Sequence, residues 1–352
     1  MKISIVGCGA VGSASALALA RAGHDVTIHE RFGPANAHGS SHGGARIFRL
    51  AYDEPDYVEL ARRALPRWRE LEALSGRTLL TTTGCVDHGD DASVDVVRAA
   101  LAAAGAESET LTAAQAAERW PGLHFESDVL VDPLGGRVHA AASVHVMLDL
   151  AVAAGAELRA GRALEVEAER VVTEDATIAA DAVVVAAGPW TAKLVALPEP
   201  PVVTVEQPVH FAEAAAGAGW PSFIHHPPLD ADLPFVYGLL EPGVGVKLGE
   251  HGGGRPIDPD DLDRAPLPDG IARLIRYAGR WLPGVEPDTA RATGCLYDTT
   301  ASHDFVIDRL ASGVIVAAGT SGHGFKFAPE LGELARALVE GGSPHPRFSF
   351  SG

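Results

Sequence analysis

The chain has 352 residues, 47% hydrophobic and 21% charged, a composition typical of a globular protein with room for two domains. Its 28 Lys and Arg against 46 Asp and Glu give a formal net charge of -18, so we expect neither nucleic acid nor an anionic membrane surface as a partner. Three scattered cysteines are too few for a disulfide framework or a zinc site, which indicates a reducing compartment and no metal centre.

The N-terminus enters an apolar strand at once, without the charged and apolar regions that a secretory signal requires. The longest apolar stretches, such as 14–20 and 183–187, are shorter than the roughly 20 residues that span a bilayer. We therefore expect a cytoplasmic protein.

The first thirty residues predict the start of a dinucleotide-binding unit. A buried strand leads into the G-x-G-x-x-G of Gly7, Gly9 and Gly12, a helix follows, and a second strand ends at Glu30. Gly7 permits the tight turn, Gly9 lets the backbone approach a pyrophosphate, and Gly12 lets the helix pack on the strand. Glu30 stands at the spacing where an acid hydrogen-bonds an adenosine ribose. The motif does not distinguish FAD from NAD.

The rest of the chain predicts helices and strands in alternation, then a long region of strands and loops. In chain order we expect a Gly/Ser/His-rich loop at 37–44, helices at 57–74, 93–104, 113–119 and 143–154, strands at 157–159, 163–168 and 182–187, strands and loops over 200–291 with a helix at 270–281, a strand at 314–318, a glycine-rich loop at 319–324 and a closing helix at 330–340. Pro66 should kink or divide the first of these helices.

Several separated segments resemble the signature segments of the monomeric sarcosine oxidase and N-methyltryptophan oxidase family. They are GSSHGGARIFR at 39–49, KLGEH at 247–251, CLY at 295–297 and GTSGHGFK at 319–326, with WPG at 120–122 and GPW at 188–190 as supporting matches. They occur in the family's order and span nearly the whole chain. The resemblance implies FAD as cofactor, a small carboxylate-bearing amine and dioxygen as substrates, and a monomer.

Element order and resemblance together predict an α/β protein. A Rossmann-like FAD-binding domain is interleaved with an α+β substrate domain that contains a large, mostly antiparallel sheet. We expect the FAD-binding domain to comprise 1–82, 136–203 and 296–352, and the substrate domain 83–135 and 204–295.

By resemblance, Cys295 matches the family's flavin-linking cysteine, whose sulfur bonds the 8-methyl position of the isoalloxazine ring. A lone cysteine with apolar neighbours is otherwise most often a small buried hydrophobe. The position of Cys295 before Tyr297, and its distance from the 319–324 loop, favour the covalent link. Because the linkage forms autocatalytically in the family, the sequence leaves its occurrence open.

Arg49 and Lys326 match the pair that holds the substrate carboxylate in this family. An arginine fork gives bidentate hydrogen bonds, and a nearby lysine adds a point charge. Lys247 matches the lysine beside the flavin, where a positive charge stabilises superoxide as dioxygen takes its first electron. The alternatives are an ordinary surface arginine and a lysine whose side chain merely reaches solvent from a strand.

The resemblance assigns further roles. Arg46 and His42 correspond to residues near the flavin ring, and Tyr237, His251 and Tyr297 to residues that line the substrate cavity. The remaining cofactor-binding positions are Ser40, Gly188, Gly322, His323 and Gly324, with Lys326 also bordering the cofactor.

Three departures from the family pattern put sarcosine itself in doubt. Gly44-Ala45 replaces an Asp-Thr pair, which removes polar contacts close to the flavin. Asp298 stands where a threonine is usual, and Ile224 where a methionine lines the pocket. A bulkier or cyclic amino acid, including an intermediate of specialised metabolism, is equally compatible.

The reaction implied is transfer of a hydride or its equivalent from the substrate to flavin N5, giving an imine that hydrolyses in water, while dioxygen becomes hydrogen peroxide. The nearest alternative is a flavin amine dehydrogenase that uses another electron acceptor. A nicotinamide dehydrogenase and a non-catalytic flavin-binding protein are more distant alternatives.

Overall fold

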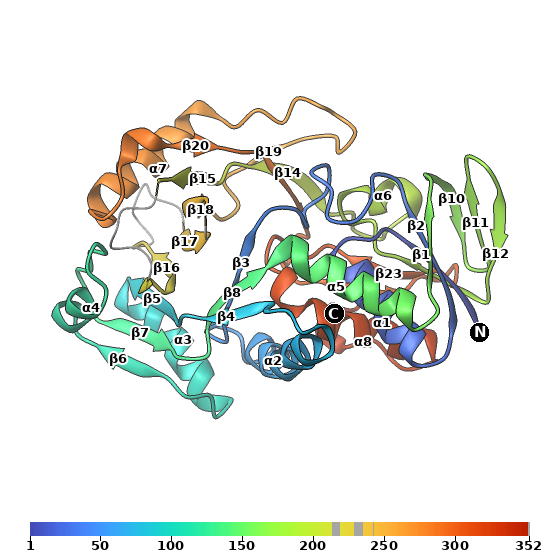
Figure 1. The fold of residues 1–352 in the computed structure, drawn as a ribbon, viewed down its shortest axis with the longest axis horizontal. Coiled ribbons are helices and arrows are strands. Elements are labelled where there is room, and N and C mark those ends of the chain that lie inside the picture. Colours follow the sequence, from blue (N-terminus) through green and yellow to red (C-terminus); the bar gives the residue numbers. More distant parts are fainter. Residues whose placement is uncertain (213–218, 229–234, 242, 351–352) are drawn as a thin grey trace.

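The computed structural model describes residues 1–212, 219–228, 235–241 and 243–350. Among them, a six-stranded sheet of order β22-β23-β13-β1-β2-β9 is parallel except for its edge strand β22. Its strands are β1 (Lys2–Val6), β2 (Asp25–Glu30), β9 (Glu157–Ala160), β13 (Ala182–Val185), β22 (Val306–Arg309) and β23 (Ile315–Ala318). Figure 1 shows that blue, green and red parts of the chain meet in this sheet.

Both faces of the central strands of the sheet are covered, which is why β1, β13 and β23 are almost continuously apolar. On one face, Ile3, Ile5 and Val184 pack in the core with the helices α1 (Ala10–Arg21), α5 (Ala140–Ala153) and α8 (Ala328–Val339). On the other, Val183 and Val185 pack beneath an antiparallel sheet of β10 (Ala163–Glu167), β11 (Arg170–Thr173) and β12 (Thr177–Ala179), and near α6 (Thr191–Leu194).

A second large sheet has eight strands within the described residues, in the order β20-β15-β18-β17-β16-β5-β7-β6. Every neighbouring pair is antiparallel except β16 and β5. The strands are β5 (Cys85–Gly89), β6 (Glu109–Leu111), β7 (Val129–Asp132), β15 (Val209–Phe211), β16 (Ser222–His226), β17 (Val236–Glu241), β18 (Gly245–Glu250) and β20 (Arg291–Ala292). The helices α3 (Asp91–Ala103), α4 (Ala113–Arg119) and α7 (Pro268–Trp281) lie in the same part of the molecule (Figure 1).

Two small antiparallel sheets lie between the large ones (Figure 1). They comprise β3 (Ala45–Phe48), β8 (Gly136–His139) and β4 (Leu80–Thr82), and β19 (Arg255–Pro256), β14 (Val202–Glu206) and β21 (Cys295–Thr299). Strands β3 and β21 carry signature segments of the sequence, so both segments are placed where the two halves of the molecule meet.

The predicted fold class is confirmed: a Rossmann-like parallel sheet is combined with a large, mostly antiparallel one. Strands of the antiparallel sheet come from 85–132 and 209–292, although the exact domain boundaries stay a prediction. No helix in the described part of the chain is long and apolar enough to cross a membrane.

Pro66 was expected to kink or divide its helix, and division is contradicted by the structure. Helix α2 runs unbroken over Pro55–Ser75 with Pro66 inside it. Proline removes one intrahelical hydrogen bond, but burial of residues such as Val58, Ala64 and Trp68 stabilises the continuous helix.

The close crossing of α8 over α1 provides a stability prediction. A Cβ at Gly332 of α8 would lie 2.5 Å from the carbonyl carbon of Ala14, whereas a Cβ at Gly279 of α7 would meet only Pro287 Cγ at 3.9 Å. We expect Gly332→Ala to lower the free energy of unfolding by about 1–3 kcal/mol through overpacking. Gly279→Ala should raise it by about 0.5–1 kcal/mol because alanine favours the helix. Chemical denaturation measures both; equal effects would contradict the close packing.

Candidate active site

A cavity of about 860 Å³ extends from the glycine-rich turn after β1 to the buried cations near Lys326. Most of the residues singled out in the sequence line it. They are Gly7, Gly9, Glu30, Ser40, Arg46, Arg49, Gly188, Tyr237, Lys247, His251, Cys295, Tyr297, Gly322, His323, Gly324 and Lys326. Gly12 and His42 are not among the lining residues.

The first end of the cavity has the geometry of a nucleotide cradle. Gly7 has a φ of +103°, and a Cβ there would lie 2.4 Å from the carbonyl oxygen of Ala186, so only glycine fits. A Cβ at Gly12 would lie 2.1 Å from the Gly7 carbonyl oxygen, which is why Gly12 acts in packing rather than lining. Helix α1 begins after Gly9 without a side-chain cap, and its N-terminus borders the cavity. Such a helix start favours a phosphate.

Glu30 is fixed at this end by two backbone donors. Its Oε2 accepts a hydrogen bond from Cys8 N, and its Oε1 accepts one from Phe32 N, both at 2.8 Å. A carboxylate has about four acceptor positions, so Glu30 retains capacity for the hydroxyls of a ribose. The cradle, the helix start and the fixed acid together fit the adenosine diphosphate part of FAD.

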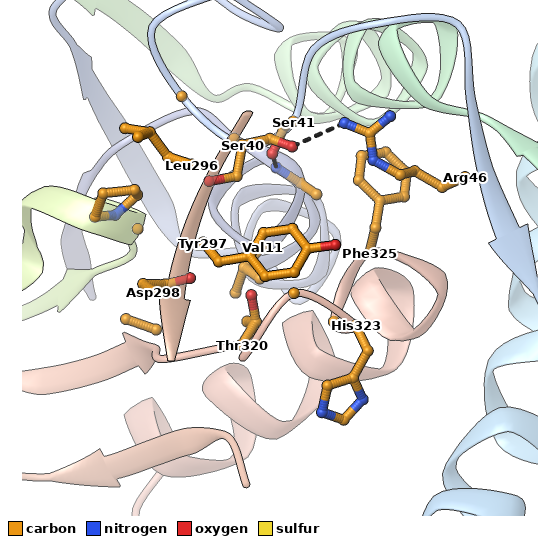
Figure 2. A pocket seen from close by; sticks show the side chains of 18 of the residues that line it. Val11, Ser40, Ser41, Arg46, Leu296, Tyr297, Asp298, Thr320, His323 and Phe325 are labelled. Atoms are coloured by element: carbon orange, nitrogen blue, oxygen red, sulfur yellow. Dashed lines mark hydrogen bonds between the residues drawn. The ribbon is translucent and has the colours of Figure 1, made fainter. Parts of the chain in front are cut away.

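The middle of the cavity is formed by segments that are far apart in sequence. Figure 2 shows Ser40 and Arg46 on one side, Thr320 and His323 on the other, and Tyr297 between them. Arg46 donates from Nη2 to the carbonyl oxygens of Ser40 and His42, at 3.0 and 2.7 Å. This fixes the guanidinium in the loop that contributes the cavity wall.

Tyr297 depends on the glycine-rich loop beside it. A Cβ at Gly322, whose φ is +74°, would lie 2.1 Å from the Tyr297 ring. The ring therefore packs directly against the loop, and only glycine fits at position 322. Burial raises the pKa of Tyr297 well above its ordinary value and that of Tyr237 to about 12. Both phenols are therefore neutral at physiological pH.

His42 lies beside the cavity rather than in its wall. Burial first, and then Arg46 and Lys247, lower the pKa of His42 to about 4, so its ring is neutral. Its Nε2 is buried and has no hydrogen-bond partner within the described residues. Burial, followed by Lys326, also lowers the pKa of His251 to about 4, so this lining histidine is neutral as well.

Alternate residues of the antiparallel sheet face the cavity. Ile224 of β16 pairs in register with Tyr237 of β17, and Lys247 of β18 pairs with Leu239; all four line the cavity. Lys247 is only 7% exposed. Burial and the nearby Arg46 lower its pKa to about 7, against a smaller opposing effect of Cys295 and Glu241.

The far end brings together the two cations expected to bind a carboxylate. Lys326 Nζ donates to the Tyr52 hydroxyl at 2.7 Å, and the Arg49 guanidinium lies 4.4 Å from the centre of the same ring. Burial and then Arg49 lower the pKa of Lys326 well below its ordinary value. Burial opposes the charge on Arg49, but Asp87, at 3.1 Å from Nη1, raises the pKa of this guanidinium above its ordinary value.

Two departures from the family pattern have structural explanations that the sequence did not reveal. A Cβ at Gly44 would lie 2.2 Å from Glu241 Oε1, and that oxygen accepts a hydrogen bond from Gly44 N at 3.0 Å. The room that a side chain at position 44 would need thus holds a carboxylate from β17. Asp298 Oδ2 accepts from Gly319 N at 2.8 Å and holds the start of the glycine-rich loop.

Asp87, Glu241 and the structural role of Asp298 were missed from sequence. A single acid within each strand was the available signal, since a charge among apolar strand residues needs a buried partner. The partners are 38 and 197 residues away for Asp87 and Glu241, which no local pattern indicates.

The fold and this cavity define a flavin-dependent oxidoreductase, and sequence comparison agrees. Residues 2–338 match the family described as FAD dependent oxidoreductase, and the chain belongs to that family. It is 30% identical to the monomeric sarcosine oxidase of Bacillus sp. (strain B-0618), over 99% of this chain and 95% of that protein. It is 32% identical to the N-methyl-L-tryptophan oxidase of Yersinia pestis (strain Pestoides F), over 97% and 95%. The resemblance seen in the signature segments is confirmed.

Solved structures extend the similarity. The open form of NikD, described as an unusual amino acid oxidase essential for nikkomycin biosynthesis, has a TM-score of 0.84 and 27% identity, covering 99% of this chain and 96% of NikD. The L-proline dehydrogenase from P. horikoshii has a TM-score of 0.85 at 22% identity, covering 99% and 96%, and shares the fold.

The contact between Gly44 and Glu241 predicts coupled substitutions. Gly44→Ala alone should lower the free energy of unfolding by about 1–3 kcal/mol, because the new methyl group displaces the Glu241 carboxylate. In a Glu241→Ala background the same change should cost much less, a coupling of about 1 kcal/mol or more measured by chemical denaturation.

Gly39→Ala is the matched control in the same loop, because the nearest atom to its Cβ is Asn36 Oδ1 at 3.9 Å. This change should be additive with Glu241→Ala. If the losses in free energy of unfolding for Gly44→Ala and Glu241→Ala are additive, the Gly44→Ala methyl group does not collide with the Glu241 carboxylate.

Proposed function

We propose that this protein is an FAD-dependent oxidase of a carboxylate-bearing secondary amine or amino acid, with dioxygen as electron acceptor and hydrogen peroxide and an imine as products. The observation that carries the proposal is the placement of Arg49 and Lys326 around Tyr52. Lys326 is buried, the Arg49 side chain is 12% exposed, and both lie at the end of the cavity that begins at the nucleotide cradle and passes Cys295. A carboxylate bound there would face two cations.

The relatives support this substrate class, because one is named for sarcosine and the other for N-methyl-L-tryptophan. Both substrates are N-methyl amino acids with a free carboxylate. We also propose that FAD is bound covalently through Cys295 and that the protein is a cytoplasmic monomer. Its chain would be divided into the two interleaved domains predicted from the sequence.

When bound, FAD would supply a two-electron acceptor at N5 that dioxygen can reoxidise. The protein's part is to bind and orient the amine beside that acceptor. Arg49 would fix the carboxylate, and Tyr237, Tyr297 and His251 would exclude water around the carbon that loses hydride.

None of these three side chains is charged at neutral pH, since the phenol pKa values are raised and the pKa of His251 is lowered to about 4. The positive field of Arg49 disfavours an ammonium beside it. The site therefore favours the neutral amine, whose nitrogen lone pair forms the imine as hydride leaves the adjacent carbon. Water then hydrolyses the imine.

The function is tested by anaerobic and aerobic assays of purified holoprotein with N-methyl and cyclic amino acids. We expect bleaching of the flavin absorbance without air, and stoichiometric hydrogen peroxide with air. Bleaching without peroxide would instead indicate a dehydrogenase. No bleaching by any amino acid would reject the proposed substrate class.

Cys295 gives a prediction about the cofactor. After acid precipitation, we expect flavin to stay with the wild-type pellet and the intact mass to rise by one FAD. Cys295→Ser should release the flavin, whereas Cys8→Ala, which removes another buried thiol beside the cavity, should retain it. Flavin released from the wild type would assign Cys295 a packing role.

Lys247 gives a prediction about pH. Its ammonium is lost as pH rises through about 7, and the charged form should favour electron transfer to dioxygen. The rate of reoxidation should therefore fall between pH 6 and pH 8. Lys247→Met should slow reoxidation on the order of 100-fold and abolish that pH dependence.

Stopped-flow mixing of the reduced protein with dioxygen measures this step. The anaerobic reduction by amine is the internal control and should change little. A Lys247→Met variant with wild-type reoxidation and an unchanged pH profile would remove Lys247 from the oxygen reaction.

A further inference from the structure

We propose that Asp87 and His226 form a second polar subsite in the substrate cavity, which accepts a hydrogen bond from a hydroxyl or N–H group on the substrate's side chain. The preferred substrate would then be a ring-bearing amino acid with such a donor. The proposal rests on the oxidase function above and narrows its substrate class.

The position of the pair follows from sheet register. Strands β5 and β16 are parallel neighbours, with Ile224 opposite Asp87 and His226 opposite Gly89. Register partners point to the same face, and so do residues two apart on a strand. Ile224 and His226 both line the cavity, so Asp87 belongs to the cavity-facing side of the sheet.

The intervening residues point the opposite way. His88 lies against Phe125 and Trp281, and His225 contacts Trp281 and the hydroxyl of Tyr277, in the core under α7. The two sheet faces are thus distinct. One face packs in an aromatic core, and the other places Asp87 and His226 beside Arg49, the expected anchor of the substrate carboxylate.

Asp87 connects the histidine to that anchor. Its Oδ1 lies 2.8 Å from His226 Nε2 and 3.1 Å from Arg49 Nη1, and its side chain is fully buried. An ionised carboxylate can only accept, so the His226 proton resides on Nε2.

In a neutral ring with its proton on Nε2, the other nitrogen is an acceptor. No described residue makes a hydrogen bond with His226 Nδ1, and the side chain is 12% exposed, on the cavity wall. The ring of Phe235 packs perpendicular to His226 at 5.0 Å and also lines the cavity. An acceptor beside an aromatic wall is suited to a cyclic or aromatic side chain with a hydroxyl or N–H group.

A purely structural role would need only Asp87, to balance the buried charge of Arg49. Among the described residues none pairs with Nδ1 of His226, whose side chain lines the cavity. A substrate that buries this nitrogen without offering a donor removes its hydrogen bond to water. A donor on the substrate restores it. The pair thereby favours donor-bearing substrates over analogues of the same shape.

The experiment compares substrates matched except for the donor: N-methyl-L-tyrosine against N-methyl-L-phenylalanine, and hydroxypipecolate against pipecolate. With wild-type holoprotein, we expect kcat/KM to be about 10-fold higher for the donor-bearing member of at least one pair, the effect of one hydrogen bond. His226→Phe should abolish this preference by lowering kcat/KM for the donor-bearing member, with little change for the other.

His225→Phe is the matched control, since it alters the neighbouring histidine on the opposite face and should keep the preference. Flavin content and melting temperature establish that each variant is folded, and His226→Leu replaces His226→Phe if the latter does not fold. A second readout needs no turnover: 4-hydroxybenzoate and benzoate are titrated against the flavin absorbance. Wild type should bind the hydroxylated acid about 10-fold more tightly, and His226→Phe should bind both alike.

The subsite proposal would be overturned by equal kcat/KM values within both pairs, or by a preference for the donor-bearing substrate that survives in His226→Phe. A preference for substrates that carry a second carboxylate would also overturn it. These outcomes leave the oxidase function intact. Conversely, if no amino acid reduces the flavin, the oxidase proposal fails, while the benzoate titration still decides whether His226 accepts a hydrogen bond from a ligand.

Discussion

The buried contact between Arg49 and Asp87 is the constraint on which the active-site geometry depends. A guanidinium placed in the interior must have a partner, because an unpaired buried charge is strongly destabilising. Asp87 comes from the antiparallel sheet, whereas the Tyr52 ring under Arg49 also contacts Lys326, which follows the last strand of the parallel sheet. The same interaction that stabilises the charge therefore connects the two halves of the molecule around the cavity.

This arrangement would also allow a chain with a net charge of -18 to bind the carboxylate of the proposed substrate. The surface potential is repulsive, so attraction must be local and shielded from solvent. Other titratable groups in or beside the wall avoid adding charge: burial lowers the pKa of His251 in the wall and of His42 beside it to about 4, and raises that of Tyr237 to about 12. These histidines and this phenol therefore add no charge to the field in the cavity.

The sequence predicted those parts of the site that are encoded locally or in recognisable segments. The glycine turn, Glu30 and both cations that we expect to bind a carboxylate line the same cavity. His42 does not line it, since being near Arg46 in the chain does not determine the direction of a side chain. The short strands β4 to β7 were missed because strands of three to five residues carry too little periodicity, and their pairing is decided by tertiary contacts.

The sequence could not predict which acidic side chain would accept hydrogen bonds from which loop. The change to Gly44 suggested a loss of polar contacts, yet Glu241 brings a carboxylate to the Gly44 amide from 197 residues away. Asp298 likewise stands where the family has threonine, and its carboxylate fixes the Gly319 amide. At Gly44 the departure is balanced by a carboxylate from a distant strand, whereas at Asp298 the new carboxylate itself holds a distant loop. The chemistry of a site is therefore better judged by which group occupies a space than by which residue occupies a position, as the Glu241 carboxylate beside Gly44 illustrates.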